Sequence, residues 1–410
     1  MAQKLTIGLS LSLSGEYAAM GRQAEVALRL FVGDTNAGGG IVAAGQRYEL
    51  ALECIDDNSR RDRVAQIYRV LCFERRVDLV FGPYSSGLTR VAAPLADQAG
   101  MVLVNHGGAD DDLHSRAYPM VFGVLTPASE YMTAMVRLLT TLKFWRKRVA
   151  IFSSGSPFAR AVAGGVERAC AERRARRRGV RICLKFAGSF APAPTTERLA
   201  RALRRNRINI LLSAGSYAHD LAMMRLGVSP QLNIPVLGCI AAGVAGFHDD
   251  LSEDAEGIVG PSQWEEDVQV TPAIGPTPAE FVRRMRTQSA GAVDYPAAQI
   301  YAAGLVTAAA IRAADSPDQE RLRRAFPDLR TSTFFGDFAI ERATGRQTGH
   351  RMLLVQWHGG RKVIIEPEPI DDSGSLELPS GWRLLFGSQW ARLRRRGDES
   401  DRAHERDDED

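Results

Sequence analysis

The stretch "VDLVFGPYSSGLTRVAAPLADQAGMVLVNHGGADD", from Val77 to Asp111, decides the fold class. It contains an apolar strand, a turn of small residues and a helix, followed by a second strand and a second small-residue turn. Apolar strands that alternate with helical segments are typical of parallel sheets with helices on both faces. Neither turn carries an obvious catalytic side chain, which raises the question of what two such turns hold.

The same alternation continues to about residue 260. We expect strands in the segments KLTIGLSLS, YELALECID, VDLVFGP, MVLVNH, RVAIFSS, VRICLKF, INILLSAG and IPVLGCI. We expect helices at residues 21–35, 61–75, 86–98, 159–176 and 218–226. The pattern starts again near residue 125, after "PMVFGVL". The sequence therefore predicts an α/β protein with two similar lobes, each a doubly wound sheet.

The composition is that of an ordinary globular protein. The 410 residues are 45% hydrophobic and 24% charged, and the net charge of +4 gives no argument for a nucleic-acid partner. A chain of this length is expected to form two or three units. The five cysteines form neither a CxxC pair nor a cluster with histidine, so a zinc site or a disulfide framework is not indicated. One or two bridges, for instance Cys170 with Cys183, stay open.

No targeting or membrane-spanning segment is visible in the sequence. The amino terminus enters a strand almost at once, without a basic segment followed by an apolar one, so we expect no signal peptide. As written, the protein is expected in the cytoplasm, and removal of a leader is the competing explanation. No apolar run approaches about 18 residues, so the chain is not expected to span a membrane.

The residues that follow each strand are the candidates for ligand binding, because ligands of doubly wound sheets bind beyond the carboxyl ends of the strands. Most of them are small or hydroxylic, which suits close approach of backbone N–H groups to a ligand. Ser85 and Ser86 give the strongest signal. Either hydroxyl can cap the following helix, and the same geometry leaves helix N–H groups facing a carboxylate or a similar oxyanion. The turns concerned are residues 12–15, 56–58, 84–87, 105–108, 153–158, 215–217 and 239–242.

Motifs that would indicate catalysis are incomplete. The glycine-rich segment Gly38–Arg47 follows a helix and lacks the Lys-Ser/Thr ending of a phosphate loop. Ser216 in "AGSYA" lacks the glycine pattern and the later acid and histidine of a nucleophile elbow. The seven histidines form no zinc motif. We therefore expect no enzyme activity, no cofactor and no metal.

Two charged segments differ from the rest of the chain. The stretch Arg168–Arg207 is rich in arginine and is expected to be a solvated helix face or, alternatively, a docking surface for an acidic partner. Residues 369–410 form a C-terminal extension that ends in a mixed charge run, which we expect to be disordered.

Six segments, in order, resemble the type I periplasmic solute-binding proteins of ABC transporters, specifically the branched-chain amino acid and amide-binding (leucine-binding-protein-like) family. The segments are IGLSLSLSGEYAAMGRQAEVAL, DTNAGGGI with YELALECIDD behind it, LVFGPYSSGLTRVAAPLA, DAEGIV, YAAGLVTAAAIRAA, and TFFGDFAIERATGRQTG followed by LLVQWHGGRKVI. They cover about residues 4–367. No single segment is diagnostic, but six in family order strongly support the resemblance.

The resemblance implies two Rossmann-like lobes joined by three hinge crossings, near residues 123–126, 260–263 and 331–334. Lobe 1 would comprise residues 1–124 and 263–331, and lobe 2 would comprise residues 125–262 and 332–368. The lobes would close by hinge bending over a ligand in the cleft between them. This architecture implies binding without catalysis.

The resemblance also implies partners and a location. A small-molecule ligand would be delivered to an ABC-type permease from the periplasm. The alternative is a cytosolic ligand sensor of the same fold that acts on a regulatory protein. In either case we expect a monomer or homodimer that binds no nucleic acid.

The carry-over of ligand-binding positions is uneven. The family's carboxylate-binding serine falls on Ser86, and the next ligand loop begins at Asn105 and ends at Ala109, where amino-acid binders place a threonine. In the second lobe the usual Tyr-Gly pair is Ser156-Pro157. The expected ligand-binding residues are Ser14, Tyr84, Ser85, Ser86, Asn105, His106, Gly107, Ser156, Phe158, Ser216, Tyr217 and Ile240.

The acid that pairs with a ligand ammonium in this family would fall near Ile240, and no acid stands there. A buried ammonium without a carboxylate partner costs several kcal/mol. We therefore expect a ligand with an oxyanion or amide end and a neutral body. His106 is expected to add positive charge below about pH 6.5. If an amino acid binds instead, the first acids to consider are Asp56, Asp110 and Glu265.

Overall fold

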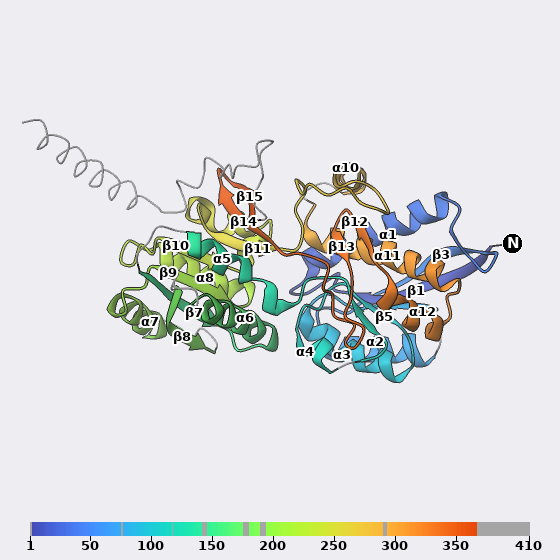
Figure 1. Ribbon diagram of the computed structural model, residues 1–410, viewed down its shortest axis with the longest axis horizontal. Coiled ribbons are helices and arrows are strands. Elements are labelled where there is room, and N and C mark those ends of the chain that lie inside the picture. The colour runs from blue at the N-terminus through green and yellow to red at the C-terminus, as the bar shows by residue number, and fades with distance from the viewer. Residues whose placement is uncertain are drawn as a thin grey trace, which may run out of the picture. The chain divides into compact units, whose positions relative to one another are not determined.

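The computed structural model describes residues 2–74, 77–116, 118–141, 146–174, 180–188, 194–289 and 293–366. The chain divides into two compact units (Figure 1). Unit 1 comprises Met1–Tyr131 and Ser262–Met352, and unit 2 comprises Met132–Pro261 and the chain from Leu353 onward. The chain thus passes between the units three times, and the predicted fold class is confirmed. The C-terminal extension predicted at residues 369–410 lies outside the described residues.

Unit 1 contains a six-stranded sheet with the order β2-β3-β1-β4-β5-β6. All neighbours are parallel except β2, which pairs antiparallel with β3. The short strands β4, β5 and β6 are buried at every position, as expected for parallel strands covered on both faces. The strands are β1 (Gln3–Leu11), β2 (Ile41–Ala43), β3 (Gln46–Asp56), β4 (Leu79–Phe81), β5 (Leu103–Asn105) and β6 (Val121–Gly123).

The helices of unit 1 pack in pairs over this sheet. They are α1 (Ala18–Ala37), α2 (Arg61–Phe73), α3 (Ser86–Gln98), α4 (Asp112–Ser115), α10 (Pro278–Gln288), α11 (Tyr295–Ala314) and α12 (Gln319–Ala325). Helix α1 packs against α11, and α2 packs against α3. By length and composition alone α11 could cross a membrane, but 72% of its apolar window is buried inside the protein. It is the core helix of unit 1.

Unit 2 contains a seven-stranded sheet with the order β15-β14-β11-β10-β9-β7-β8. Its strands are β7 (Lys147–Ser153), β8 (Val180–Ala187), β9 (Ile210–Ala214), β10 (Val236–Cys239), β11 (Val259–Ser262), β14 (Leu353–His358) and β15 (Arg361–Glu366). Strands β7 to β11 are parallel, and β14 and β15 form an antiparallel edge. The helices are α5 (Thr133–Thr141), α6 (Pro157–Arg174), α7 (Pro194–Arg205), α8 (Tyr217–Val228) and α9 (Phe247–Leu251).

The third passage between the units lies later in the chain than the resemblance implied. We expected it near residues 331–334, whereas the division falls between Met352 and Leu353. The intervening hairpin of β12 (Thr331–Thr333) and β13 (Gly336–Phe338) belongs to unit 1. Trp264 Nε1 donates a hydrogen bond to the Phe334 carbonyl (3.0 Å), which holds the hairpin on the aromatic core of unit 1.

All five cysteines are free thiols in the structure, including Cys170 and Cys183, which the sequence left open as a disulfide pair. Cys170 is buried in α6, and Cys183 is partly buried in β8. Burial raises the pKa of Cys54 and of Cys72 to about 12, so both stay protonated at neutral pH. The fold is therefore held by packing and hydrogen bonds.

Candidate functional site

The two turns of the opening stretch pack against each other at the carboxyl edge of the unit 1 sheet, and the second turn, residues 105–110, is buried. Ser85 N–H donates to the Gly107 carbonyl (3.2 Å). The Ser86 hydroxyl oxygen accepts hydrogen bonds from the backbone N–H groups of Ala109 and Asp110, each at 3.1 Å. The turn after β4 and the turn after β5 are therefore tied together.

Gly107 is required by this close approach. A Cβ atom at position 107 would lie 2.4 Å from the Pro83 carbonyl oxygen and 2.6 Å from the Tyr84 Cα. No side chain fits at that distance, so only glycine lets the second turn pack on the first. Gly107 is therefore important because it has no side chain, which lets the two turns pack together.

Asn105, a predicted ligand contact, is buried and shapes its own turn. Its Oδ1 accepts from the N–H groups of Gly107 (3.3 Å) and Gly108 (2.8 Å), and its Nδ2 donates to the Gly108 carbonyl (2.7 Å). An amide is the side chain that can both accept and donate here. The structure therefore gives Asn105 a bracing role, and its contact with a ligand stays a prediction.

Ser85 has an unusual backbone conformation, with φ 94° and ψ 144°. Residues other than glycine rarely adopt such angles, at a cost of about 1–3 kcal/mol, and they persist mainly where function requires them. Its side chain caps α3 by accepting from Leu88 N–H (3.4 Å). The start of α3 is therefore a strained position of the backbone.

The Ser86 hydroxyl keeps its proton for another acceptor, because it is the acceptor in both of these hydrogen bonds. The neighbouring Asp110 carboxylate is neutralised by Arg90 (Nη1 to Oδ2, 2.5 Å). Burial raises the pKa of Asp110, which further favours its neutral form. The first turn of α3 contains no acid. Little uncompensated negative charge therefore remains around the Ser86 hydroxyl.

His106 belongs to the second turn and is fully buried. Neither of its ring nitrogens has a hydrogen-bond partner among the residues that the structure describes. Burial lowers its pKa to about 4. The expectation of a positive charge on His106 below about pH 6.5 is therefore wrong, and the imidazole is neutral above about pH 4. A neutral imidazole can still accept or donate one hydrogen bond.

Asp56, considered from the sequence as an acid for a ligand ammonium, already accepts several hydrogen bonds from the protein itself. Its carboxylate accepts from Leu13 N–H (2.9 Å), from Asn58 N–H (2.9 Å) and from the Ser14 hydroxyl (2.8 Å). Although burial alone would raise its pKa, these hydrogen bonds lower the pKa of Asp56 below its usual value. Both Asp56 and the predicted contact Ser14 therefore organise the turn after β1.

A group of tyrosines accompanies Tyr84 in unit 1. The hydroxyls of Tyr84 and Tyr295 lie 2.5 Å apart, and the rings of Tyr17 and Tyr84 meet edge to face at 5.8 Å between centroids. Tyr131 accepts a hydrogen bond from Gln263 Nε2 (3.0 Å). Sequence reasoning identified only Tyr84. Tyr295 begins α11 directly after its cap Asp294, and this helix start was the available signal.

In unit 2, the predicted residues follow β7, β9 and β10. The Ser156 hydroxyl accepts from Ala159 N–H (3.1 Å) and so caps α6, close in sequence to Phe158. Ser216 Oγ lies 2.6 Å from His219 Nδ1. The Tyr217 hydroxyl donates to Asp250 Oδ2 (2.6 Å), and Asp250 is exposed. Asp250 is thus an acid beside a predicted ligand contact that sequence reasoning missed.

The turn after β10, where Ile240 precedes a short 3₁₀ helix, is braced by a buried carboxylate. Asp220 accepts hydrogen bonds from the Ser213 hydroxyl (2.6 Å), Gly215 N–H (2.8 Å) and Ala241 N–H (3.0 Å). Burial raises the pKa of Asp220 to about 7, although these hydrogen bonds act in the opposite direction. The sequence shows no acid near Ile240, but folding brings Asp220 there.

Glu265, the remaining candidate acid, lies outside the turns that carry the predicted contacts, in the segment that follows β11. Within the ranges that the structure describes, no group of three or more histidine, cysteine, aspartate or glutamate side chains could hold a metal ion.

Solved structures with this fold show the same architecture at low sequence identity. An ABC transporter substrate-binding protein from Desulfitobacterium hafniense in complex with leucine has a TM-score of 0.72 and 19% identity, covering 88% of this chain and 100% of its own. A branched-chain amino acid binding protein from Streptococcus pneumoniae in complex with isoleucine has a TM-score of 0.70 and 17% identity, covering 88% and 99%. A solute-binding protein from R. palustris in complex with benzoate has a TM-score of 0.67 and 17% identity, covering 88% and 95%.

The family comparison covers most of the chain. The model of the family described as "Periplasmic binding protein" matches residues 4–362. That range includes both units and all of the turns described above, and it agrees with the six segments that suggested the resemblance. The chain therefore belongs to the periplasmic binding protein family, whose members bind solutes without catalysis.

Proposed function

We propose that this protein binds a small solute through a carboxylate or amide end held by the joined turns of unit 1. The observation that carries the proposal is the Ser86 hydroxyl, which accepts two backbone N–H groups and keeps its own proton to donate. It stands in the first turn of α3, where the helix dipole also favours negative charge. A hydrogen bond from a neutral donor to a charged oxygen contributes about 1.5–3 kcal/mol.

The charges around the turns support an anionic end over an ammonium. Asp110 is paired with Arg90, and Asp56 is engaged by the turn after β1. A ligand ammonium near these turns would therefore find no available carboxylate from either residue. The tyrosines around Tyr84 offer a neutral aromatic surface for the body of the ligand.

We further propose that the solute also contacts unit 2 through Phe158, Ser216 and Tyr217, and that it is delivered to an ABC-type importer from the periplasm. The family membership supports this delivery role, and the leucine, isoleucine and benzoate complexes show the range of ligands that the fold accepts. A ligand that contacts both units would shift the population of conformations toward the closed form.

The test is isothermal titration calorimetry of the purified protein with benzoate, aliphatic carboxylates, short amides, leucine and isoleucine. We expect a carboxylate or an amide to bind, and Ser86→Ala to weaken that binding by about tenfold to a hundredfold. The matched control is Ser316→Ala, because the Ser316 hydroxyl also accepts a backbone N–H, that of Asp318, outside the two turns. This control should leave the affinity unchanged.

Two results would contradict the proposal. Binding of a carboxylate that does not depend on Ser86 would place the oxyanion elsewhere. Binding confined to amino acids and lost in Asp250→Asn would make the ammonium, and the acid beside Tyr217, the determinant of recognition.

A further inference from the structure

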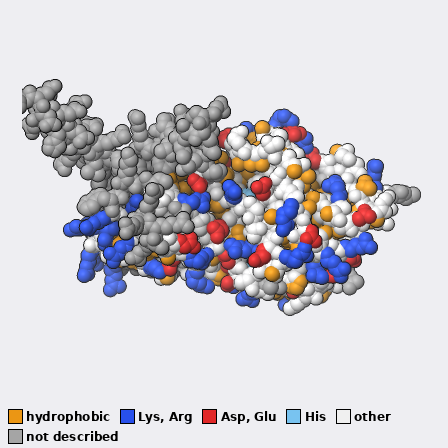
Figure 2. All heavy atoms as spheres, viewed as in Figure 1, with side chains coloured by type: hydrophobic (Ala, Val, Ile, Leu, Met, Phe, Trp, Pro, Cys, Tyr) orange, Lys and Arg blue, Asp and Glu red, His pale blue; other side chains and the backbone are white. Residues whose placement is uncertain are grey.

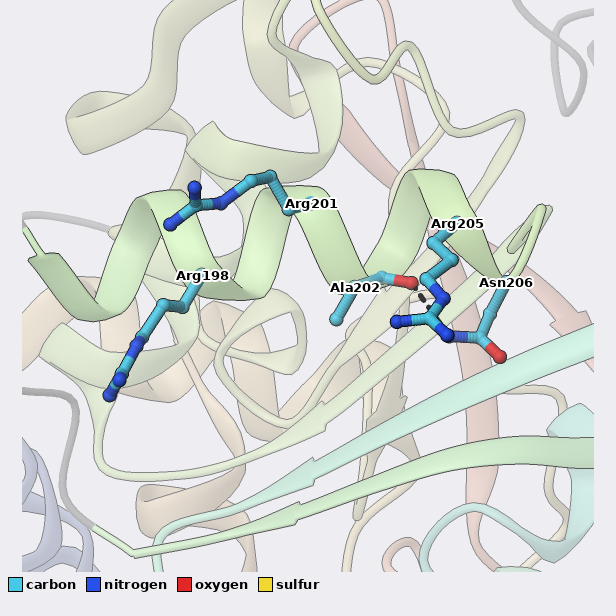
Figure 3. A pocket seen from close by; sticks show the side chains of 5 residues that line it. All are labelled: Arg198, Arg201, Ala202, Arg205 and Asn206. Carbon is cyan, nitrogen blue, oxygen red and sulfur yellow. Dashed lines mark hydrogen bonds between the residues drawn. The ribbon is translucent and has the colours of Figure 1, made fainter.

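Unit 2 carries a cluster of arginines around two adjacent hollows. The first has a volume of about 740 Å³ and the second about 460 Å³, and Arg205 lines both. Figure 3 shows Arg198 and Arg201 extending from α7, with Arg205 and Asn206 near the end of that helix. The first hollow is lined by Arg198, Arg201, Ala202, Arg205 and Asn206, and the second by Arg146, Arg148, Arg205, Arg207 and Asn209. We call these residues the arginine cluster.

The cluster is assembled by the fold of unit 2. Arg198, Arg201 and Arg205 are spaced by three and four residues, which places them on one face of α7. Arg148 Nε donates to the Asn206 carbonyl (2.6 Å) and so ties the start of β7 to the end of α7. Asn209 Nδ2 donates to the Arg146 carbonyl (2.7 Å) across the starts of β9 and β7. The backbone beneath the arginines is therefore fixed by hydrogen bonds.

The positive charge of four arginines of the cluster is not compensated within the part of the chain that the structure describes. Arg198, Arg201, Arg205 and Arg207 are exposed, and none of them forms an ion pair with a described carboxylate. The only acid on α7 is Glu197. Figure 2 shows Lys and Arg side chains gathered at the margin of the molecule where Figure 1 places α7. An anionic partner would relieve the repulsion among these side chains.

The cluster is also separate from the predicted solute contacts of unit 2. Arg146, Arg148 and Asn209 precede β7 and β9 or stand at their starts, whereas Ser156 and Ser216 follow the ends of the same strands. Because β7 and β9 are parallel, the cluster lies at the amino edge of the sheet and the predicted contacts lie at its carboxyl edge. The cluster therefore calls for a different occupant.

We propose that the acidic segment "DESDRAHERDDED", residues 398–410 of this same chain, docks on the arginine cluster. The segment holds eight carboxylates against two arginines, and it lies outside the described residues. Its charge is opposite to that of the cluster. Arginine is the side chain best suited to binding carboxylates, because its planar guanidinium can form two parallel hydrogen bonds.

The chain length allows this docking. The described chain ends at Glu366 of β15, where the Glu366 carboxylate pairs with Arg137 of α5, the helix that leads to β7. Five strand steps separate β15 from β7 in the sheet, a span of about 24 Å. Random-coil statistics for a chain of the length between Glu366 and Asp398 give a root-mean-square end-to-end distance of about 30 Å. Tethering at this range gives an effective concentration on the order of millimolar.

The test measures whether the cluster is already occupied in the full-length protein. A synthetic peptide of residues 398–410 is titrated by fluorescence anisotropy against two full-length proteins at low salt. One is the natural chain. The other carries Asp→Asn and Glu→Gln changes throughout residues 398–410. We expect the natural chain to bind the peptide at least about tenfold more weakly than the neutralised chain, because its own segment competes.

Charge-reversal variants test whether the peptide binds at the arginine cluster. In the neutralised chain, Arg201→Glu with Arg205→Glu should abolish peptide binding. The matched control, Arg321→Glu with Arg351→Glu, reverses two exposed arginines of unit 1 that form no ion pair with a described carboxylate. It should leave peptide binding unchanged. A peptide with the same neutralising changes should not bind any of these proteins.

Three results would contradict the proposal. If both full-length chains bind the peptide with equal affinity, the cluster is open and serves an external acidic partner, so the proposal fails. If neither chain binds it, the charges do not recognise each other, and the proposal fails as well. If sedimentation shows that the natural chain forms dimers that the neutralised chain does not, the segment docks on a second copy and not on its own chain.

Discussion

In each unit, a buried polar side chain holds a turn together by accepting hydrogen bonds from backbone N–H groups, but the side chain differs between the units. In unit 1, buried Asn105 gathers the N–H groups of Gly107 and Gly108. In unit 2, buried Asp220 gathers the N–H groups of Gly215 and Ala241. Both side chains follow the rule that buried polar groups need hydrogen-bond partners. Asn105 is a neutral amide, whereas Asp220 is a carboxyl group that can carry a negative charge.

The difference in charge between Asn105 and Asp220 leads to opposite expectations for the ligand groups near the two turns. The neutral amide of Asn105 adds no negative charge to the turns around Ser86, and Arg90 compensates the carboxylate of Asp110 there, so we expect an oxyanion to be tolerated. The carboxylate of Asp220 places a group whose pKa is about 7 beneath the turn of Ile240, which favours hydrogen-bond donors on that side. Substitutions at the two braces and at the turns beside Ser86 test this contrast.

Asp220 should make the stability of the protein depend on pH. Its pKa is about 7 in the folded state and 3.8 in the unfolded chain, so the folded protein keeps a proton that the unfolded chain has lost. The free energy of unfolding should therefore fall as pH rises from about 4 to about 7, by up to about 4 kcal/mol. Urea unfolding of the natural protein and of Asp220→Asn over this range checks it. Equal slopes for the two proteins would show that Asp220 is not the group that titrates.

Placing a carboxylate in the unit 1 turn should abolish its preference for anions. Asn105→Asp adds a negative charge near Ser86 and loses the bond to the Gly108 carbonyl, and it should weaken carboxylate binding by about 3 kcal/mol. The control is Asn36→Asp, since Asn36 bonds in the same way to the backbone of Leu50, away from the turns. Calorimetry with the best ligand should show a large loss only for Asn105→Asp. Comparable losses in both variants would mean that general destabilisation is the cause.

Separating the two turns should weaken binding as well as folding. In Gly107→Ala the new methyl group would collide with Pro83 and Tyr84, at a cost of about 2 kcal/mol in stability. Gly33→Ala is the control, because a Cβ at Gly33 in α1 meets nothing within 4 Å and alanine favours a helix. Thermal unfolding should show a lower midpoint for the first variant and a raised one for the second. An unchanged midpoint in Gly107→Ala would show that the turns are not packed this closely.

The smallest expected effect concerns the strain at Ser85. Ser85→Gly should raise the free energy of unfolding by about 1 kcal/mol, because glycine adopts its backbone angles without strain. Glycine is also only slightly inferior to serine as a helix cap. Ser85→Ala keeps the strain and loses the cap, so it should destabilise by about 1 kcal/mol. The two variants should therefore move chemical unfolding in opposite directions, and movement in the same direction would remove the strain argument.

Local patterns predicted the elements well. Helix α3 was expected at residues 86–98, where the structure has it, because Ser85, Ser86 and the following apolar spacing are all contained in a short segment. The helix expected at 61–75 ends two residues earlier, at Phe73, and the one expected at 218–226 extends to Val228. Helix ends are less sharply encoded than helix interiors.

The sequence by itself determined the α/β class, the two lobes and the turns that carry the predicted contacts, because hydrophobic periodicity and turn chemistry act between near neighbours in the chain. Only the tertiary structure decided which of those side chains are already bonded. Asp220 reaches Ala241, Tyr84 meets Tyr295, and the hairpin at Phe334 joins Trp264. These pairs are distant in sequence, and their contact depends on how the strands and helices pack, which no local pattern encodes.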